Sequence, residues 1–140
     1  MARFALVTGG SSGIGEQYVR QLAAEGRNVV VVSNRDAENQ RVAASVRAEF
    51  GVEVEPLCVD LTEPTAAEQI FEFCVARSIE VDVLINNAGM LIFNQLEHTE
   101  PSRLDSIIAL HCTAPTKLCR LFAPVMRERG GGHIVLMSSV

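Results

Sequence analysis

Short, uninterrupted apolar runs of the kind that form buried β-strands recur along the chain and alternate with segments of helical periodicity. In the run Val29-Val30-Val31-Val32 no polar residue intervenes, which is typical of a strand covered on both faces. Strands separated by helical crossovers lie parallel in one sheet. Five strands are predicted, at Phe4 to Val7, Val29 to Val32, about Val54 to Val59, Val83 to Ile85 and Ile134 to Met137. The pattern predicts one α/β domain over residues 1–140.

Apolar residues at helical spacing predict the buried faces of the intervening helices. The first two stripes are Ile14, Tyr18 and Leu22, ending at Gly26, and Val42, Val46 and Phe50, ending at Gly51. Thr62 is expected to cap the third helix, with Pro64 in its first turn, and Thr99 to cap the fourth. A fifth helix is predicted from about Pro115 to Arg127. The later stripes are Ile70, Phe71, Cys74 and Val75, then Leu104, Ile107, Ile108 and His111.

Composition and charge narrow the classes of function. The hydrophobic fraction of 48% agrees with a sheet buried on both faces. The net charge of −5 comes from acidic residues spread along the chain, and the 12 basic residues form no stripe, which argues against a nucleic-acid partner. No apolar run approaches the ~20 residues that cross a bilayer, and no signal-type segment follows Met1, so we predict a cytoplasmic protein without membrane attachment.

The four cysteines form no Cys-x-x-Cys pair and have no histidine at metal-ligand spacing. Their positions are Cys58, Cys74, Cys112 and Cys119. We therefore expect buried free thiols and no metal site.

A glycine-rich loop follows the first predicted strand and leads into the first helix. Its sequence is Thr8-Gly9-Gly10-Ser11-Ser12-Gly13-Ile14-Gly15, with the spacing Gly-x-x-x-Gly-x-Gly. Backbone N–H groups and the positive end of a helix dipole at such a position can receive a pyrophosphate. Glycines permit the tight turn and let the backbone approach the phosphates closely. The alternative is an ordinary Gly/Ser turn, but the position between strand and amphipathic helix favours a dinucleotide site.

Three further motifs lie at strand ends in a fixed order. Asp60 follows the third strand, Asn86-Asn87-Ala88-Gly89 follows the fourth, and Ser138-Ser139 follows the fifth. Together with the glycine loop, they resemble the short-chain dehydrogenase/reductase family. The resemblance implies a Rossmann-like, doubly wound parallel sheet whose first five strands have the order 3-2-1-4-5. It covers the whole chain but only the first half or so of a family member, and we expect a chain that stops at a core strand to be truncated.

The resemblance also implies roles for individual residues. The pyrophosphate would be held by Gly9, Ser11, Ser12, Gly13, Ile14 and Gly15. Asp60 and Leu61 would flank the adenine, and the turn Asn86, Asn87, Ala88 and Gly89 would support the sheet and pass its backbone along the cofactor. From the residues alone, Asp60 leads into a helix and the two asparagines form a strand-to-loop turn, and both interpretations can hold together.

Ser139 aligns with the catalytic serine of the family, whose hydroxyl hydrogen-bonds the substrate oxygen. Its place agrees with the rule that ligands bind outside the carboxyl ends of the strands, whereas on a purely structural interpretation both serines merely end a strand. His111 stands where the family usually has an asparagine that organises a proton relay. An imidazole can relay protons, but a histidine in an apolar helix can equally be a hydrogen-bonded packing residue.

The end of the second strand bears on the choice of cofactor. Ser33 stands where relatives that prefer NAD place an acid for the ribose 2′-hydroxyl, and Asn34 and Arg35 follow. A guanidinium near this site can bind a 2′-phosphate bidentately, although Arg35 can equally be a solvated residue that begins the next helix. We therefore expect NADP(H) in preference to NAD(H).

The resemblance implies an oxidoreductase that moves a hydride between a nicotinamide and a small-molecule carbonyl compound or secondary alcohol. This chain lacks the Tyr-x-x-x-Lys motif of the family, because its one tyrosine is Tyr18 and its one lysine is Lys117. We expect it to be inactive alone. The alternatives are a non-catalytic nucleotide-binding module or truncated pseudo-enzyme, and an adenosylmethionine-dependent transferase, which explains neither the Asn86-Asn87-Ala88-Gly89 turn nor Ser139.

Family members often pair through the two helices after the fourth strand, which here span about residues 100–128. Apolar residues in the second of these helices can serve such a homo-oligomer or the core of the domain. They are Leu118, Leu121, Phe122 and Val125.

Overall fold

The computed structural model describes residues 3–139 and contains a parallel five-stranded sheet of order β3-β2-β1-β4-β5. The strands are β1 Arg3–Thr8, β2 Asn28–Ser33, β3 Val54–Cys58, β4 Glu80–Asn86 and β5 His133–Leu136. The helices are α1 Gly13–Ala24, α2 Asp36–Phe50, α3 Ala66–Ala76, α4 Pro101–Ile108 and α5 Ala114–Glu128, with a 3₁₀ turn η1 Leu96–His98 and a π-helical turn η2 Ala109–Thr113. The predicted Rossmann-like order is confirmed.

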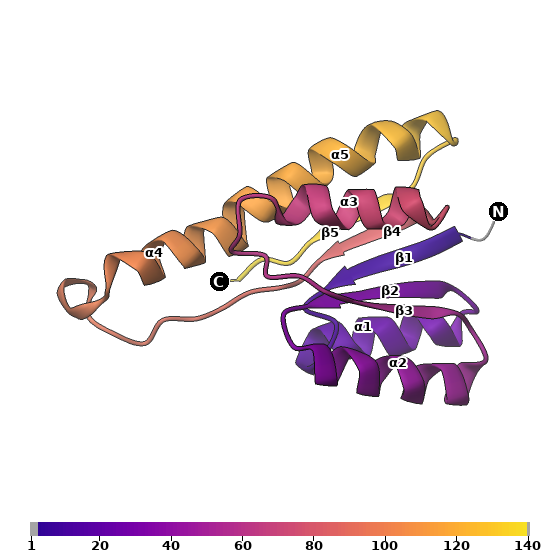
Figure 1. The fold of residues 1–140 in the computed structure, drawn as a ribbon, viewed down its shortest axis with the longest axis horizontal. Helices are drawn as coiled ribbons and strands as arrows, with labels where there is room; N and C mark the ends of the chain where they lie inside the picture. The colour runs from indigo at the N-terminus through magenta and orange to yellow at the C-terminus, as the bar shows by residue number, and fades with distance from the viewer. Residues whose placement is uncertain (1–2, 140) are drawn as a thin grey trace.

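Two hydrophobic cores lie on opposite faces of the sheet, because successive strand residues point to opposite sides. Val29 and Val31 of β2 belong to the core under α1 and α2, whereas Val30 and Val32 belong to the core under α3 and α5. All four are fully buried. Figure 1 shows α1 and α2 on one face of the sheet and α3 and α5 on the other. This two-sided cover explains why the strand sequences are continuously apolar.

The predicted buried face of α1 is wrong by one position. Ile14 is 62% exposed, and the buried residues of α1 are Gly15, Val19 and Ala23. Tyr18 and Leu22 pack only partly against the core. The small residues Gly15 and Ala23 let the α1 backbone approach the sheet closely, and this displaces the larger apolar side chains to the flank of the contact.

The predicted start of α3 is also wrong. Thr62 does not cap it, because the helix begins at Ala66 with Thr65 at its N-cap position. The buried stripe holds for Ile70 and Cys74, and the Phe71 ring packs edge-on against the Phe122 ring with centroids 5.2 Å apart. It does not hold for Val75, which is 63% exposed. In α2, Val42 and Val46 are buried as predicted, and Phe50 is half-buried.

The chain from α4 to α5 winds on through η2, whose flanking residues keep right-handed helical dihedrals. Thr99 does not cap α4, because Glu100 takes the N-cap position; the Thr99 hydroxyl donates to the carbonyl of Gln95. The predicted buried stripe of α4 is wrong, since the helix contains no buried residue and Ile108 is 57% exposed. Figure 1 shows the reason: α4 extends beyond the end of the sheet.

The apolar residues of α5 divide between the core and the surface. Leu118 and Phe122 are buried against the sheet, whereas Leu121 and Val125 are half-buried. The first pair therefore belongs to the core of the domain.

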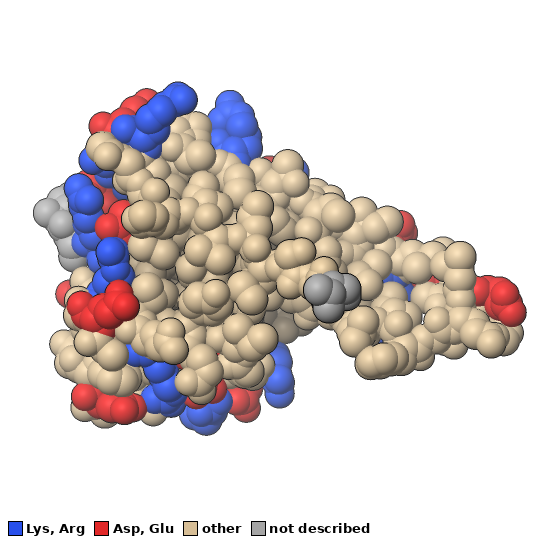
Figure 2. Space-filling view, turned by 180° about the vertical axis from the view of Figure 1, so that it is seen from behind, with Lys and Arg blue, Asp and Glu red and all other residues tan. Residues whose placement is uncertain are grey.

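Apolar side chains are also exposed at β5 and just after it, at Ile134, Leu136 and Met137. Seen from behind, the broad face of the molecule carries few charged side chains, which gather at its rim (Figure 2).

The four cysteines are free but do not share one environment. Cys74 is buried in α3, and burial raises the pKa of its thiol to about 12. Cys119 in α5 is half-buried, and burial likewise raises its pKa. The prediction of buried thiols is wrong for Cys58, at the end of an edge strand, and for Cys112 in η2, which are both exposed.

Within residues 3–139, no helix combines the length and the apolar character that crossing a membrane requires. The same residues contain no group of three histidine, cysteine, aspartate or glutamate side chains that could hold a metal ion.

Candidate cofactor-binding site

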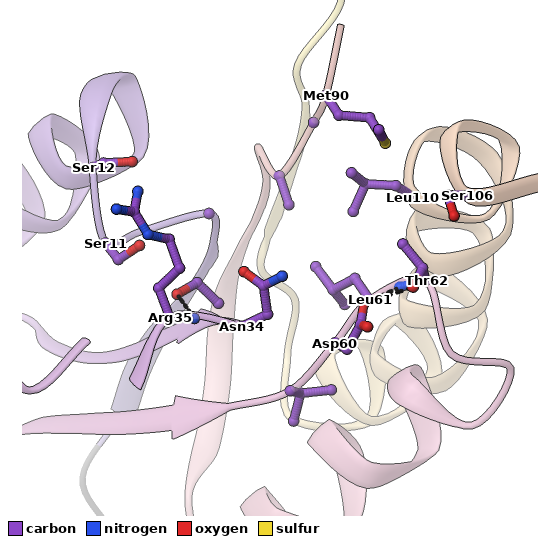
Figure 3. Close-up of a pocket in the computed structure, with 15 residues that line it drawn as sticks. Ser11, Ser12, Asn34, Arg35, Asp60, Leu61, Thr62, Met90, Ser106 and Leu110 are labelled. Atoms are coloured by element: carbon purple, nitrogen blue, oxygen red, sulfur yellow. Dashed lines mark hydrogen bonds between the residues drawn. The ribbon is translucent and has the colours of Figure 1, made fainter. Parts of the chain in front are cut away.

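A cleft of about 450 Å³ opens where the carboxyl ends of the strands meet the loops that follow them (Figure 3). It brings together most of the residues that the sequence assigned to a cofactor. They are Gly9, Ser11, Ser12, Ser33, Asn34, Arg35, Asp60, Leu61, Ala88 and Gly89. In an open parallel sheet, this edge is where ligands bind, and the volume lies within the range of small-molecule sites.

The glycine loop has a backbone that other residues rarely adopt. Gly9 and Gly13 have φ angles of +66° and +54°, and no atom lies within 4 Å of the place where a Cβ of Gly13 would stand. Gly15 has the opposite surroundings, because a Cβ there would lie 2.0 Å from the carbonyl oxygen of Gly9. Gly15 therefore allows α1 to pack against the loop, whereas Gly13 leaves open space in front of it. Gly13, Ile14 and Gly15 do not line the cleft itself.

Thr8 and Asn87 fasten the glycine loop to the turn after β4. The Thr8 hydroxyl accepts hydrogen bonds from the backbone N–H groups of Asn87 and Ala88, each at 3.0 Å. In return, the Asn87 amide donates to the carbonyl oxygens of Thr8 and Gly9, at 3.2 and 3.3 Å. Thr8 is only 2% exposed. These bonds hold two walls of the cleft in one position, so Asn87 supports the cleft without lining it.

Asp60 forms a local turn at the opposite wall. Its Oδ1 accepts hydrogen bonds from the backbone N–H and the hydroxyl of Thr62, at 2.9 and 2.7 Å. Such a turn is a common use of an aspartate before a helix. The same turn buries Leu61, which is 6% exposed, at the cleft wall.

The turn after β2 lies across the cleft from Asp60 and carries no carboxylate at Ser33, Asn34 or Arg35. Figure 3 shows the Arg35 guanidinium extending toward Ser11 and Ser12 of the glycine loop, while Asn34 faces the centre of the cleft. The side chain of Ser33 is nearly buried and accepts a hydrogen bond from the backbone N–H of Arg35 at 3.1 Å. The site thus presents a cation beside the glycine loop.

An ion-pair network behind the glycine loop joins α1 to α2. Glu16 accepts from Arg20 and Arg41, each at 3.0 Å, and Arg41 also donates to the carbonyl of Ser11 at 3.5 Å. Burial by itself raises the pKa of the Glu16 carboxyl, but the hydrogen bonds from the two guanidinium groups outweigh burial and leave the pKa below its ordinary value. The carboxylate therefore stays ionised and keeps Arg41 at the base of the loop.

His111 closes the far end of the site. Its Nε2 lies 3.0 Å from the backbone N and 2.9 Å from the backbone O of Met90, so one tautomer accepts from the N–H and the other donates to the carbonyl. Its ring also fills the space beside Gly89, where a Cβ would lie 2.8 Å from its Cε1. The ring sits in the π-helical turn η2, a feature that is frequent at functional sites.

A second hollow, of about 570 Å³, adjoins His111 between η2, α5 and the end of β5. His111, Asn86 and Ser138 line it, and Ser139 does not. Asn86 is 6% exposed; its Nδ2 lies 3.8 Å from the Cys119 sulfur, and its Oδ1 has no hydrogen-bond partner within residues 3–139. Of the two residues predicted to be catalytic, His111 lines this hollow and Ser139 does not.

Sequence reasoning missed several residues that shape the cleft. Val59, Thr62, Met90, Ser106 and Leu110 also line it. Ser106 and Leu110 lie in α4 and η2, whose periodicity gave no sign that they face a ligand. Thr8 was quoted only as part of the loop motif, although a threonine directly before the first glycine is placed to bond across to the neighbouring strand end.

The sheet order, the glycine loop before α1 and the cleft at the strand ends together define a Rossmann-type nucleotide-binding domain. The sequence model of the short chain dehydrogenases matches residues 3–140, and the chain belongs to this family of oxidoreductases. A short chain dehydrogenase of Pseudocercospora fijiensis is 35% identical over 139 residues, which cover 97% of this chain and 44% of the relative.

Two solved structures extend the comparison. A short-chain dehydrogenase from Sphingobium yanoikuyae in complex with NADPH is 34% identical, with a TM-score of 0.91, over 100% of this chain and 54% of the other. The L-sorbose reductase of Gluconobacter frateurii, complexed with NADPH and L-sorbose, is 31% identical, with a TM-score of 0.89, over 95% of this chain and 51% of the other. The chain spans about half the length of the relatives it matches.

Proposed function

We propose that this chain is the cofactor-binding half of an NADP(H)-dependent oxidoreductase that acts on a small carbonyl compound or secondary alcohol. When bound, the nicotinamide supplies or accepts the hydride. The observation that carries the proposal is the cleft itself, where an open glycine loop faces a turn that bears Arg35 and no carboxylate. Two relatives of like fold were solved with NADPH, which supports the same cofactor here.

The residues present fit such a cofactor. The left-handed Gly9 and Gly13 and the open space at Gly13 form a cradle that a side chain would fill. Ser12, at the N-cap of α1, makes no side-chain capping bond, so it leaves the first N–H groups of the helix to a phosphate. We assign the pyrophosphate to residues 9–15 and the adenine to the wall formed by Asp60 and Leu61. The backbone of residues 86–89 would run along the cofactor toward the nicotinamide.

The cradle is tested by Gly13→Val, with Gly26→Val as the matched control. Both glycines have positive φ angles, +54° and +85°, and open space where a Cβ would stand, and they lie at opposite ends of α1. The backbone strain is therefore similar, but only Gly13 faces the proposed pyrophosphate. We expect NADPH binding, measured by calorimetry, to be abolished in Gly13→Val and retained in Gly26→Val. Equal affinities in the two variants would refute the loop assignment.

The preference for NADP(H) is tested at the end of β2. Ser33→Asp places a carboxylate near the ribose, where it repels a 2′-phosphate and accepts a hydrogen bond from a 2′-hydroxyl. The unaltered chain should bind NADPH more tightly than NADH, and Ser33→Asp should shift the preference toward NADH. A preference of the unaltered chain for NADH would show that the cofactor has been misassigned.

We further propose that the 140-residue chain binds cofactor without turning over substrate. A carbonyl that receives hydride needs a proton donor in reach. The one tyrosine, Tyr18, donates to the sulfur of Met137 at 3.4 Å, whereas the one lysine, Lys117, is bonded to Pro64 and Glu68 on the other face of the sheet. They cannot act as a pair. Ser139 and His111 remain the candidates for orienting a substrate and supplying a proton.

An NADPH-oxidation assay with a panel of ketones tests whether this half of the enzyme only binds the cofactor or also turns over substrate. No turnover is expected, although NADPH binds. Turnover that is lost in His111→Ala would overturn the expectation and make the histidine the acid. An absence of any NADPH binding by the folded chain would instead reject the cofactor-binding function as a whole.

A further inference from the structure

The turn between β2 and α2 is held by one buried amide. Asn39, in the first turns of α2, is 0% exposed. Its Oδ1 lies 2.6 Å from the Ser33 hydroxyl, and its Nδ2 donates to the carbonyl oxygens of Ser33 and Leu57 at 3.1 and 3.2 Å. Both N–H groups of the amide and its carbonyl oxygen are thus hydrogen-bonded. A fully satisfied buried amide of this kind holds its partners in one arrangement.

The orientation of this amide follows from its neighbours. The two carbonyl oxygens can only accept, so the NH₂ end must face them and Oδ1 must face Ser33. The hydrogen of the Ser33 hydroxyl is therefore given to Asn39. The hydroxyl oxygen then accepts the backbone N–H of Arg35 at 3.1 Å. One chain of hydrogen bonds runs from Asn39 through Ser33 to the backbone of Arg35.

This chain of hydrogen bonds matters because the side chain of Arg35 does not itself fix the start of α2. Arg35 is the N-cap residue of α2, and its side chain makes no capping hydrogen bond. A serine, threonine, aspartate or asparagine usually fills this position and uses its side chain to cap the helix. Here the guanidinium extends toward the glycine loop instead (Figure 3). The carbonyl of Arg35 accepts the backbone N–H of Asn39 at 2.9 Å. Asn39 therefore bonds the Arg35 carbonyl directly and the Arg35 N–H through the Ser33 hydroxyl.

We infer that Asn39 is a positioning residue for recognition of the ribose 2′-phosphate, acting through Ser33 and the backbone of Arg35. The inference rests on the proposed preference for NADP(H). Without the amide, the turn Ser33-Asn34-Arg35 samples other conformations, and the guanidinium is no longer held beside the phosphate position. Contacts to the adenine and to the 5′-phosphate come from other segments and are unaffected.

Two fragment ligands isolate this effect in the full 140-residue chain. Adenosine 2′,5′-bisphosphate carries the 2′-phosphate, and adenosine 5′-monophosphate lacks it. By calorimetry, Asn39→Leu, which keeps a similar side-chain volume, should weaken the bisphosphate about tenfold and change the monophosphate less than about twofold, within the usual coupling range of one hydrogen-bond network. Gln40→Leu makes the same kind of change at an exposed neighbour in the same helix and should alter neither affinity.

A double-mutant cycle decides whether Asn39 acts through the proposed route. Ser33→Ala should weaken the bisphosphate as Asn39→Leu does, and combining the two should add nothing further. Should Asn39→Leu fail to fold in a thermal melt, Ser33→Ala and its effect on the ratio of the two affinities carry the same test. Equal losses for both ligands, or additive losses in the double variant, would overturn the role of Asn39. Equal affinity of the unaltered chain for the two ligands would refute the NADP(H) preference itself.

Discussion

The two ends of the site are built in different ways. At the nucleotide end, Thr8 and Asn39 are buried and fully hydrogen-bonded, and they fix the loops that carry the glycines and Arg35. At the other end, His111 is exposed and is bonded to Met90 in the loop after β4, and farther along this loop Phe93 is 91% exposed. Buried polar networks determine one conformation, whereas exposed loops leave several accessible. The comparison indicates that these residues specify nucleotide binding more completely than they specify a substrate site.

The difference is sharpest at the packing of Gly15, where the largest effect is expected. Replacing a glycine in a helix with alanine usually stabilises the protein by about 1 kcal/mol. In Gly15→Ala, however, the new Cβ would lie 2.0 Å from the Gly9 carbonyl oxygen and 2.5 Å from Asn87 Nδ2. We expect a loss of about 3 kcal/mol or more in the free energy of unfolding, measured with denaturant, together with loss of NADPH binding.

Gly51→Ala is the control for this substitution. Gly51 has a φ angle of +69° at the end of α2 and open space around its Cβ position, so only backbone strain of about 1–2 kcal/mol is expected. If Gly15→Ala proves no more costly than Gly51→Ala, the close packing of the glycine loop on α1 is not what holds the nucleotide end together.

The second prediction removes one hydroxyl from the same end. Thr8→Val keeps the shape of the side chain but leaves the N–H groups of Asn87 and Ala88 without their acceptor. We expect a loss of about 2 kcal/mol in the free energy of unfolding, the usual cost of unsatisfied buried donors, and weaker NADPH binding. Thr8→Ser retains the hydroxyl and should recover most of both. A larger loss in Thr8→Ser than in Thr8→Val would point to the methyl group, which serine lacks and valine keeps, rather than to the hydrogen bonds.

How far the sequence predicted this architecture depends on the kind of contact. The strand order followed from the resemblance to a known family, whereas the two-sided burial of Val29 to Val32 followed from their continuous apolar run. The buried face of α1 did not, because the sheet is contacted there by Gly15 and Ala23, which give little hydrophobic signal. Asn39 was missed for a related reason: a polar residue in a helix is expected at the surface, and only the positions of Ser33 and Leu57 in space make its burial favourable.

The candidate site shows the same division. Motifs at strand ends predicted the residues that converge on the cleft, because parallel strands bring their carboxyl ends to one edge. The contributions of Ser106 and Leu110 depend on how α4 and η2 project past the sheet, and that path has no signature in local sequence.

A third and smaller effect is expected from the ion pairs behind the glycine loop. The Glu16 carboxylate is only 16% exposed, and Glu16→Gln removes its ion pairs with Arg20 and Arg41. We expect a loss of about 1 kcal/mol in the free energy of unfolding at neutral pH. The pKa of Glu16 is lowered in the folded chain, so its stabilisation is complete above the pKa of the unfolded chain and is lost as pH falls through the lower folded pKa.

Denaturant titrations of both proteins across the acid range test this sign. The difference between the unaltered chain and Glu16→Gln should shrink as the pH falls below the ordinary range of a glutamate carboxyl. A difference that stays constant, or grows, toward acid pH would mean that the network does not stabilise the ionised carboxylate.

The smallest change in stability is expected at the exposed end. His111→Ala removes one hydrogen bond between Nε2 and the Met90 backbone from a residue that already faces solvent, so the free energy of unfolding should change by less than about 0.5 kcal/mol. The local effect should be larger, because the Met90 N–H has no other hydrogen-bond acceptor within residues 3–139.

Amide hydrogen exchange at Met90 should become faster, while exchange at Asn87, whose N–H donates to Thr8, should stay unchanged. Thr8→Val should give the opposite pattern, and His111→Asn, which restores a donor and an acceptor, should slow exchange at Met90 again. Faster exchange at both amides in His111→Ala would show that the two ends open as one unit, and the contrast drawn between them would be wrong.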